Sequence, residues 1–113
     1  MKIAIIGSRD FNNYKLVIET LESYKSKISL VVSGAAKGAD SLGEKWAIDN
    51  NIQTLIFPAD WEKHGKRAGF IRNEDIIKNC DGVIAFWDGE SKGTAHSLSL
   101  AEKYNKPSKI IKI

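Results

Sequence analysis

The chain has 113 residues, of which 42% are hydrophobic and 27% charged, and its formal net charge is +3. These values are typical of one soluble globular domain, and the length excludes a second fold joined by a linker. The mild positive charge is spread along the sequence, so it does not indicate the concentrated basic face of a dedicated DNA-binding protein.

Five apolar runs without polar alternation predict five strands, at residues 2–6, 29–33, 53–57, 82–86 and 109–113. Such runs are typical of strands covered on both faces, as in a parallel sheet. Residues at helical spacing lie between them, so strand and helix alternate from end to end. We therefore expect one domain spanning residues 1–113, an α/β three-layer Rossmann-like open parallel sheet with the strand order 3-2-1-4-5.

In such a sheet, ligands bind beyond the carboxyl ends of the strands, near the point where the strand order reverses. The first predicted strand is followed there by "GSRDF". Gly7 permits a tight turn, Ser8 and Arg9 can point into the crevice, and Arg9 can grip a phosphate or carboxylate with two hydrogen bonds. A surface arginine beside a turn glycine explains this segment about equally well. The segment is not the G-x-G-x-x-G dinucleotide fingerprint.

The second predicted strand leads into "SGAAKGAD", residues 33–40. Small residues and glycines let backbone N–H groups approach a ligand, and the following helix adds a partial positive charge. Gly38 allows close approach, while Asp40 or Ser41 can cap the helix. A purely structural turn, or pairing of Asp40 with Arg9, is the alternative. The Walker pattern is absent, so triphosphate hydrolysis is unsupported.

The segment after the third predicted strand, "FPADWEKHGKRAGFIRNEDI", is longer than a usual connection and is interpreted as a binding lid. Trp61, with cationic neighbours, suits stacking on a base, although a core or rim anchor is equally compatible. Arg72 and Asn73 are expected at the start of a helix, where donors can converge on an anion. His64 has no histidine or cysteine at metal-ligand spacing, so no metal site is expected.

The fourth predicted strand is followed by "FWDGESKGTAHS", a second candidate anion site at the start of a helix. His96 is expected to be a packing or surface residue. The ligand-binding residues predicted from all four segments are Gly7, Ser8, Arg9, Ser33, Gly34, Ala35, Lys37, Gly38, Asp40, Trp61, Arg72, Asn73, Trp87, Ser91, Gly93 and Thr94. No cofactor is predicted and no catalytic residue is assigned.

The single cysteine, Cys80, cannot form an internal disulfide and is expected to be a buried, inert thiol. The amino-terminal apolar run is too short for a signal peptide, and no segment approaches membrane-spanning length. We therefore expect a cytoplasmic protein that has no membrane partner.

The segments "GSRDF", "SGAAKGAD", "FPADW", "GKRAGFIRN" and "AFWDGESKGT", in this order, resemble the YspA-like (DUF2493) branch of the SLOG superfamily over almost the whole chain. The superfamily includes cytokinin-activating LOG phosphoribohydrolases, the DNA-processing protein A family and nucleotide-sensing domains of bacterial immune systems. The resemblance implies a Rossmann-like fold with a crevice for a nucleotide or a nucleotide-derived ligand.

Compared with the phosphoribohydrolase motif P-G-G-x-G-T-x-x-E, Gly93, Thr94 and the upstream Arg72 match. Ser97 stands at the position of the catalytic glutamate, and Ala35 departs from the glycine more usual in the second motif. A hydroxyl cannot supply the carboxylate that stabilises a ribosyl oxocarbenium ion or activates water. The resemblance thus implies loss of N-glycosidic hydrolysis.

The leading hypothesis is a SLOG-like nucleotide-binding domain. It holds a nucleotide, or an NAD-derived or cyclic signalling nucleotide, without turnover, as a sensor in anti-phage immunity or as a sequestering protein. The alternative is a phosphoribohydrolase-like enzyme in which another carboxylate replaces the missing glutamate, the candidates being Asp10, Asp40, Asp60, Glu62, Asp88 and Glu90.

Single-stranded DNA binding is the third hypothesis. Because the net charge is mild, nucleic acid is not expected as a partner. By analogy with the superfamily, a homodimer or larger oligomer is expected.

Overall fold

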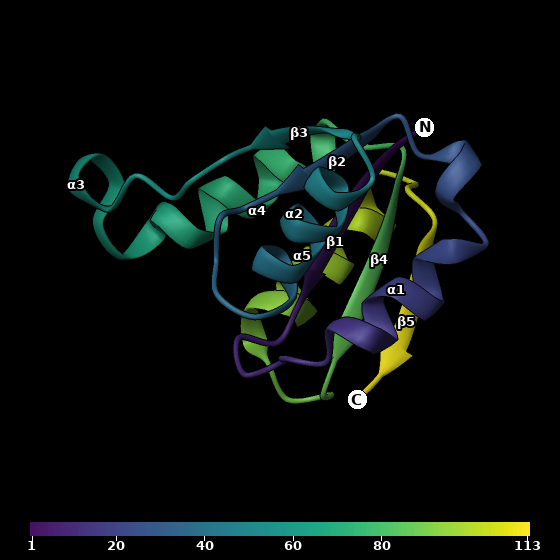
Figure 1. Ribbon diagram of the computed structural model, residues 1–113. Coiled ribbons are helices and arrows are strands. Elements are labelled where there is room, and N and C mark those ends of the chain that lie inside the picture. Colours follow the sequence, from purple (N-terminus) through teal and green to yellow (C-terminus); the bar gives the residue numbers. More distant parts are fainter.

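The computed structural model describes residues 1–113 and contains one five-stranded parallel sheet in the order β3-β2-β1-β4-β5 (Figure 1). The predicted fold class and strand order are therefore confirmed. The strands are β1 (Lys2–Gly7), β2 (Leu30–Ser33), β3 (Gln53–Ile56), β4 (Gly82–Trp87) and β5 (Ser108–Lys112). The helices are α1 (Tyr14–Glu22), α2 (Ala39–Asp49), α3 (Trp61–His64), α4 (Ala68–Lys78) and α5 (Lys92–Lys103), with 3-10 turns η1 (Lys25–Lys27) and η2 (Gly65–Arg67).

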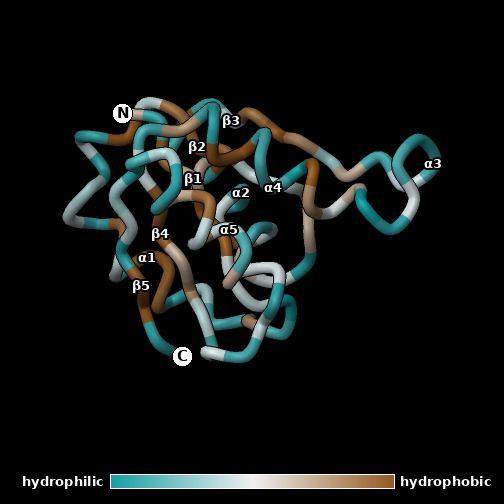
Figure 2. The backbone as a smooth tube through the Cα atoms, turned by 180° about the vertical axis from the view of Figure 1, so that it is seen from behind, coloured by the Kyte–Doolittle hydropathy of each residue, from teal (hydrophilic) through white to brown (hydrophobic).

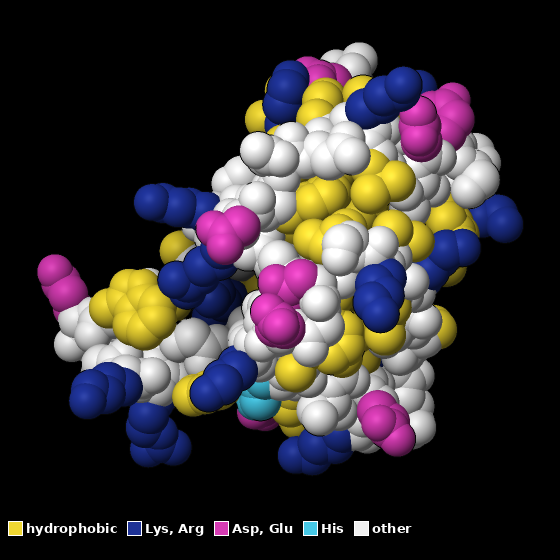
Figure 3. Space-filling view, turned by 90° about the horizontal axis from the view of Figure 1, so that it is seen from below, with side chains coloured by type: hydrophobic (Ala, Val, Ile, Leu, Met, Phe, Trp, Pro, Cys, Tyr) yellow, Lys and Arg dark blue, Asp and Glu magenta, His cyan; other side chains and the backbone are white.

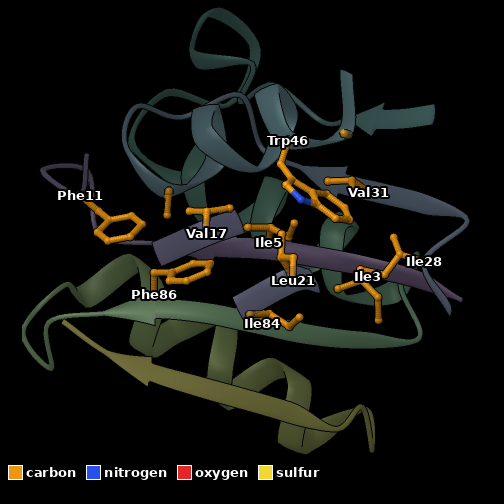
Figure 4. Close-up of a cluster of buried hydrophobic side chains, with 12 residues drawn as sticks. Ile3, Ile5, Phe11, Val17, Leu21, Ile28, Val31, Trp46, Ile84 and Phe86 are labelled. Atoms are coloured by element: carbon orange, nitrogen blue, oxygen red, sulfur yellow. The ribbon is translucent and has the colours of Figure 1, made fainter. Parts of the chain in front are cut away.

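The central strand β1 is buried on both faces, which explains its unbroken apolar sequence. Because successive side chains point to opposite faces, Ile3 and Ile5 join one core and Ala4 and Ile6 the other. The first core packs against α1 and α2 and includes the fully buried Trp46 of α2 (Figure 4). The second packs against α4 and α5. Hydrophobic stretches of the backbone run along the strands, the edge strands included (Figure 2).

The two edge strands are less covered than their apolar sequences predicted. β3 has no fully buried residue, and Ile110 in β5 remains 50% exposed. The expectation that these strands are buried on both faces is wrong, because each lies at an edge of the sheet, where it has one neighbouring strand and is less covered than the central strands.

The segment between β3 and α4 projects away from the body (Figure 1). The predicted long loop is wrong in part, because the segment folds into α3, capped by the Asp60 side chain, and η2. The prediction that a helix starts at Arg72 and Asn73 is also wrong. α4 already begins at Ala68, so both residues lie inside the helix and contribute side chains rather than free backbone donors.

No helix has the length and apolar character that crossing a bilayer requires. Cys80 is a free, buried thiol, and burial raises its pKa above the ordinary value. The prediction of a buried cysteine is therefore confirmed.

Candidate functional site

Two adjoining cavities open at the carboxyl ends of the strands. The first, of about 280 Å³, lies among β1, α4 and the start of α5. The second, of about 360 Å³, lies between the loop after β2 and the projecting segment. Arg9, Ala36 and Arg72 line both cavities, so the two arginines stand at their junction. We call the two the polar cavity and the tryptophan cavity, after their linings.

Most of the predicted ligand-binding residues line these cavities. Those of the polar cavity are Gly7, Arg9, Asp40, Arg72, Asn73, Ser91, Gly93 and Thr94. Those of the tryptophan cavity are Arg9, Gly34, Ala35, Lys37, Trp61 and Arg72. Segments separated by up to 87 positions in the chain thus meet at one edge of the sheet, as the parallel topology requires.

Four predicted residues do not line either cavity, because each is used to hold a loop in place. Ser8 is buried, and its Oγ accepts a hydrogen bond from the Asp88 N–H. Ser33 is buried, and its hydroxyl donates to Glu44 at 2.7 Å. Gly38 packs against the backbone carbonyls of Ser8 and Arg9. Trp87 donates its indole N–H to the Ser91 carbonyl.

Arg72 is held in place by two hydrogen bonds. Its Nη1 donates to the Gly34 carbonyl at 2.6 Å and its Nε donates to Asn73 Oδ1 at 3.0 Å. Asn73 in turn contacts His96 Nδ1 through its amide nitrogen at 3.2 Å. The guanidinium is therefore fixed at the cavity junction before any ligand arrives, which lowers the entropic cost of binding.

The charges around Arg72 favour an anion beside it. Burial lowers the pKa of the Arg72 guanidinium, the neighbouring Asp40 carboxylate opposes this effect, and Arg9 adds to it. The influence of Arg9 shows that two cationic groups lie close together here. A bound phosphate would relieve their repulsion and accept hydrogen bonds from both.

The loop "SGAAKGAD" binds its own carboxylate. Asp40 is 6% exposed, its Oδ2 accepts the Gly34 N–H at 3.1 Å, and the Ala36 N–H also stabilises its charge. The interpretation of this loop as a phosphate cradle is therefore wrong for these two backbone groups, because an internal anion already uses them. Asp40 does not cap α2 or pair with Arg9 as its main partner. Gly38 occupies the cap position without a side-chain bond, and Asp40 interacts with Arg72.

Backbone donors remain free at the start of α5. Ser91 caps this helix by accepting the Thr94 N–H, while the N–H groups of Lys92 and Gly93 have no acceptor. Asp88 fixes the preceding turn by accepting the N–H groups of Glu90 and Ser91, and these bonds lower its pKa. Since Lys92 and Gly93 line the polar cavity, the helix terminus offers an anion two donors and a favourable dipole.

Sequence reasoning missed several lining residues. Ser97 was weighed only as a substitute for a glutamate, yet it is buried and lines the polar cavity. The others are Ile6, Ala36, Pro58, Ala59, Ile76 and Lys92. Of these, Lys92 lay inside the predicted anion site and could have been named from its position. Ile6 and Ile76 belong to core patterns that carry no signal of cavity exposure.

Of the six carboxylates considered as a replacement catalytic group, only Asp40 lines a cavity. Asp60 caps α3, and Asp88 holds the turn before α5. No group of three histidine, cysteine or acidic side chains lies close enough together to bind a metal ion. Any catalytic carboxylate would thus be Asp40, although its bonds to the loop amides tie it to a structural task.

The buried Asp40 predicts a pH-dependent stability. Burial raises its pKa from 3.8 to about 6, against the lowering effects of the Gly34 N–H and Arg72. Because the pKa of Asp40 is higher in the folded than in the unfolded protein, the protonated carboxyl stabilises the fold fully below pH 4, and this stabilisation is lost as the pH rises through 6. The free energy of unfolding should fall by roughly 2 to 3 kcal/mol over this range. In urea unfolding from pH 4 to 7.5, Asp40→Asn should lack this decline. Parallel pH profiles for the two proteins would contradict the assignment.

The amino-acid sequence is similar to a known protein family and to a phage protein. A model of the "YspA, cpYpsA-related SLOG family" matches residues 1–64. The Gene 61 protein of Mycobacterium phage D29 is 36% identical over 115 residues, covering 94% of this chain and 92% of that protein.

Two solved structures share the fold. DNA processing protein A from Streptococcus pneumoniae superposes with a TM-score of 0.80 at 22% identity, covering 99% of this chain. DNA processing protein A from Helicobacter pylori, described for its single-stranded DNA binding mode, gives a TM-score of 0.69 at 23% identity over 97% of this chain. The chain spans only 50% and 64% of these two proteins, respectively. These neighbours contradict the expectation that nucleic acid is not a partner. That expectation rests on the mild net charge, whereas a protein of this fold is described as binding single-stranded DNA.

Proposed function

Because the chain belongs to the YspA, cpYpsA-related SLOG family, we propose that residues 1–113 form one nucleotide-binding domain. The crevice binds a nucleotide through its phosphate and holds it without cleavage, as the ligand-holding part of a sensor or as a sequestering protein. The observation that carries this proposal is the pair of guanidinium groups, Arg9 and Arg72, shared by two cavities and facing the free N–H groups that begin α5.

The lack of turnover rests on the groups that surround the phosphate site. Ser97 supplies only a hydroxyl, and Asp40, the one carboxylate in the crevice, already accepts a loop N–H and faces Arg72. A nucleophile or general base must instead be free to reach the reacting atom. This arrangement supports binding over N-glycosidic hydrolysis.

Single-stranded DNA is the second candidate ligand. It is favoured by the shared fold with DNA processing protein A and by the projecting segment, which carries the 55% exposed Trp61 beside Lys63, Lys66 and Arg67. Figure 3 shows basic side chains gathered on this segment and along its junction with the body. An exposed aromatic ring with nearby cations suits a strand whose bases stack and whose phosphates need neutralising.

The test is retention by the purified protein during ultrafiltration. The panel contains AMP, NAD, ADP-ribose, cyclic ADP-ribose, a cyclic dinucleotide and a ten-nucleotide oligothymidylate, each identified by mass spectrometry after heating. Recovery of an intact nucleotide supports the proposal, and retention of the oligothymidylate alone supports the second candidate. Release of a free base with a ribose phosphate would identify a hydrolase. Retention of nothing would contradict both binding functions.

A further inference from the structure

The proposed phosphate site is flanked by two compartments rather than one. Arg9 and Arg72 line both cavities, whose volumes are about 280 and 360 Å³. Each volume is near the lower end of the range that ligand pockets occupy, roughly 300–1,000 Å³. A ligand gripped by the arginines therefore has room to extend in two directions.

The tryptophan cavity has the lining of a base site. Its walls include Pro58, Ala59 and the ring of Trp61. Gly69 lies beside that ring, since a Cβ on Gly69 would meet Trp61 at 3.6 Å, an ordinary van der Waals distance. Gly69 has no side chain to cover the ring edge, and the ring is 55% exposed, so a flat aromatic group can stack on it.

The polar cavity has a different chemistry. Its lining combines the hydroxyls of Ser91, Thr94 and Ser97 with the apolar side chains of Ile6 and Ile76, next to the charged groups of Arg9, Asp40, Arg72 and Lys92. Thr94, Ser97 and Asn73 are buried, so their positions are fixed by packing. The Asn73 amide is already bonded to Arg72, Gly93 and His96, and the hydroxyls of Ser91 and Thr94 bond to each other, so Ser97 offers the most available hydroxyl. Hydroxyls beside apolar side chains suit a sugar, whose hydroxyls need hydrogen bonds and whose carbon face does not.

We propose that the ligand contains two nucleoside units joined through phosphate. One base stacks on Trp61, the linking phosphate lies between Arg9 and Arg72, and the second nucleoside enters the polar cavity with its sugar against Thr94 and Ser97. This inference rests on the proposed function and narrows it. The same chemistry occurs in a dinucleotide such as NAD, in a cyclic dinucleotide, and in two successive nucleotides of a single DNA strand.

Calorimetry on the full chain tests the inference with NAD, a cyclic dinucleotide and thymidylyl-thymidine, each compared with its mononucleotide. At least one two-nucleoside compound should bind about 10- to 100-fold tighter than its mononucleotide, the range expected from one additional stacked base. The compound that does so identifies the source of the shared chemistry.

Two variants probe the compartments separately, with circular dichroism and thermal unfolding used to verify the fold. Trp61→Ala and the double variant Thr94→Val with Ser97→Ala should each weaken the two-nucleoside compound by about tenfold or more. Only one of these two variants should weaken the binding of the mononucleotide. If mononucleotides bind as tightly as every two-nucleoside compound, or if only one variant affects the latter, the inference is overturned while phosphate binding stands. If nothing binds, the proposed function itself fails.

Discussion

Replacing Arg72 with alanine should weaken nucleotide binding by about 100-fold or more. The guanidinium is half-buried and fixed by the Gly34 carbonyl and Asn73, so its removal deletes charge and hydrogen bonds from the cavity junction. It also removes the cation that interacts with Asp40, so this carboxylate would face the ligand phosphate with Arg9 as the remaining guanidinium. Losses of about 2–5 kcal/mol are usual when one partner of a buried charged pair is removed. Calorimetry with the nucleotide retained in ultrafiltration measures the change.

Two controls separate a specific role of Arg72 from general charge. Arg72→Lys keeps the charge but loses the planar fork, so it should recover only part of the affinity. Lys25→Ala removes one exposed positive charge in η1, which precedes β2 and lies at the opposite end of the strands. This variant should bind like the unmodified protein. Equal weakening in Arg72→Ala and Lys25→Ala would show that only net charge matters.

Replacing Gly38 with alanine should destabilise the fold by about 3–5 kcal/mol. Gly38 has φ +78° and ψ −125°, a region almost restricted to glycine, where other residues cost roughly 1–3 kcal/mol. A Cβ there would also lie within 2.5 Å of the carbonyl oxygens of Ser8 and Arg9. Since backbone atoms cannot rotate aside, the two ligand-binding loops would have to separate. Chemical unfolding followed by circular dichroism measures the loss.

Gly89 provides a matched control, because its φ of +83° is similar and a Cβ there would meet nothing within 4 Å. Gly89→Ala should therefore show the conformational cost alone, about 1–2 kcal/mol. If Gly38→Ala cannot be purified in a folded form while Gly89→Ala folds, the result agrees with the larger expected loss at Gly38. Equal losses in the two variants would contradict the contact between the loops.

The sequence predicted the sheet well because its signals were strong. Residues 2–6 and 82–86 are unbroken apolar runs, and parallel strands with right-handed crossovers leave few possible orders. The location of the site follows from the same reasoning, since Arg9, Gly34 and Thr94 all lie in segments that connect a predicted strand to the next helix. This is why most of the predicted site residues line the cavities.

The errors arose where glycine and polar residues have more than one use. Gly38 and Ser33 were assigned to a ligand because small residues permit close approach, but here the close approach is between loops and to Glu44. The internal use of the loop amides by Asp40 depends on a bond over six residues that no local pattern specifies. The predicted start of α4 is too late because residues 68–71 are interpreted as part of the long connection, whereas they form the first turn of the helix.

The most direct test of a phosphate site between Arg9, Arg72 and α5 is a titration of the ¹⁵N-labelled protein with ADP, followed by two-dimensional NMR. ADP carries one base and two phosphates, so any nucleotide phosphate site should respond to it at millimolar concentration. We predict the largest shifts at the Arg72 side-chain Nε–H and the backbone N–H groups of Lys92 and Gly93. Shifts confined to the exposed lysines of the projecting segment, or no shifts at all, would contradict the proposed site.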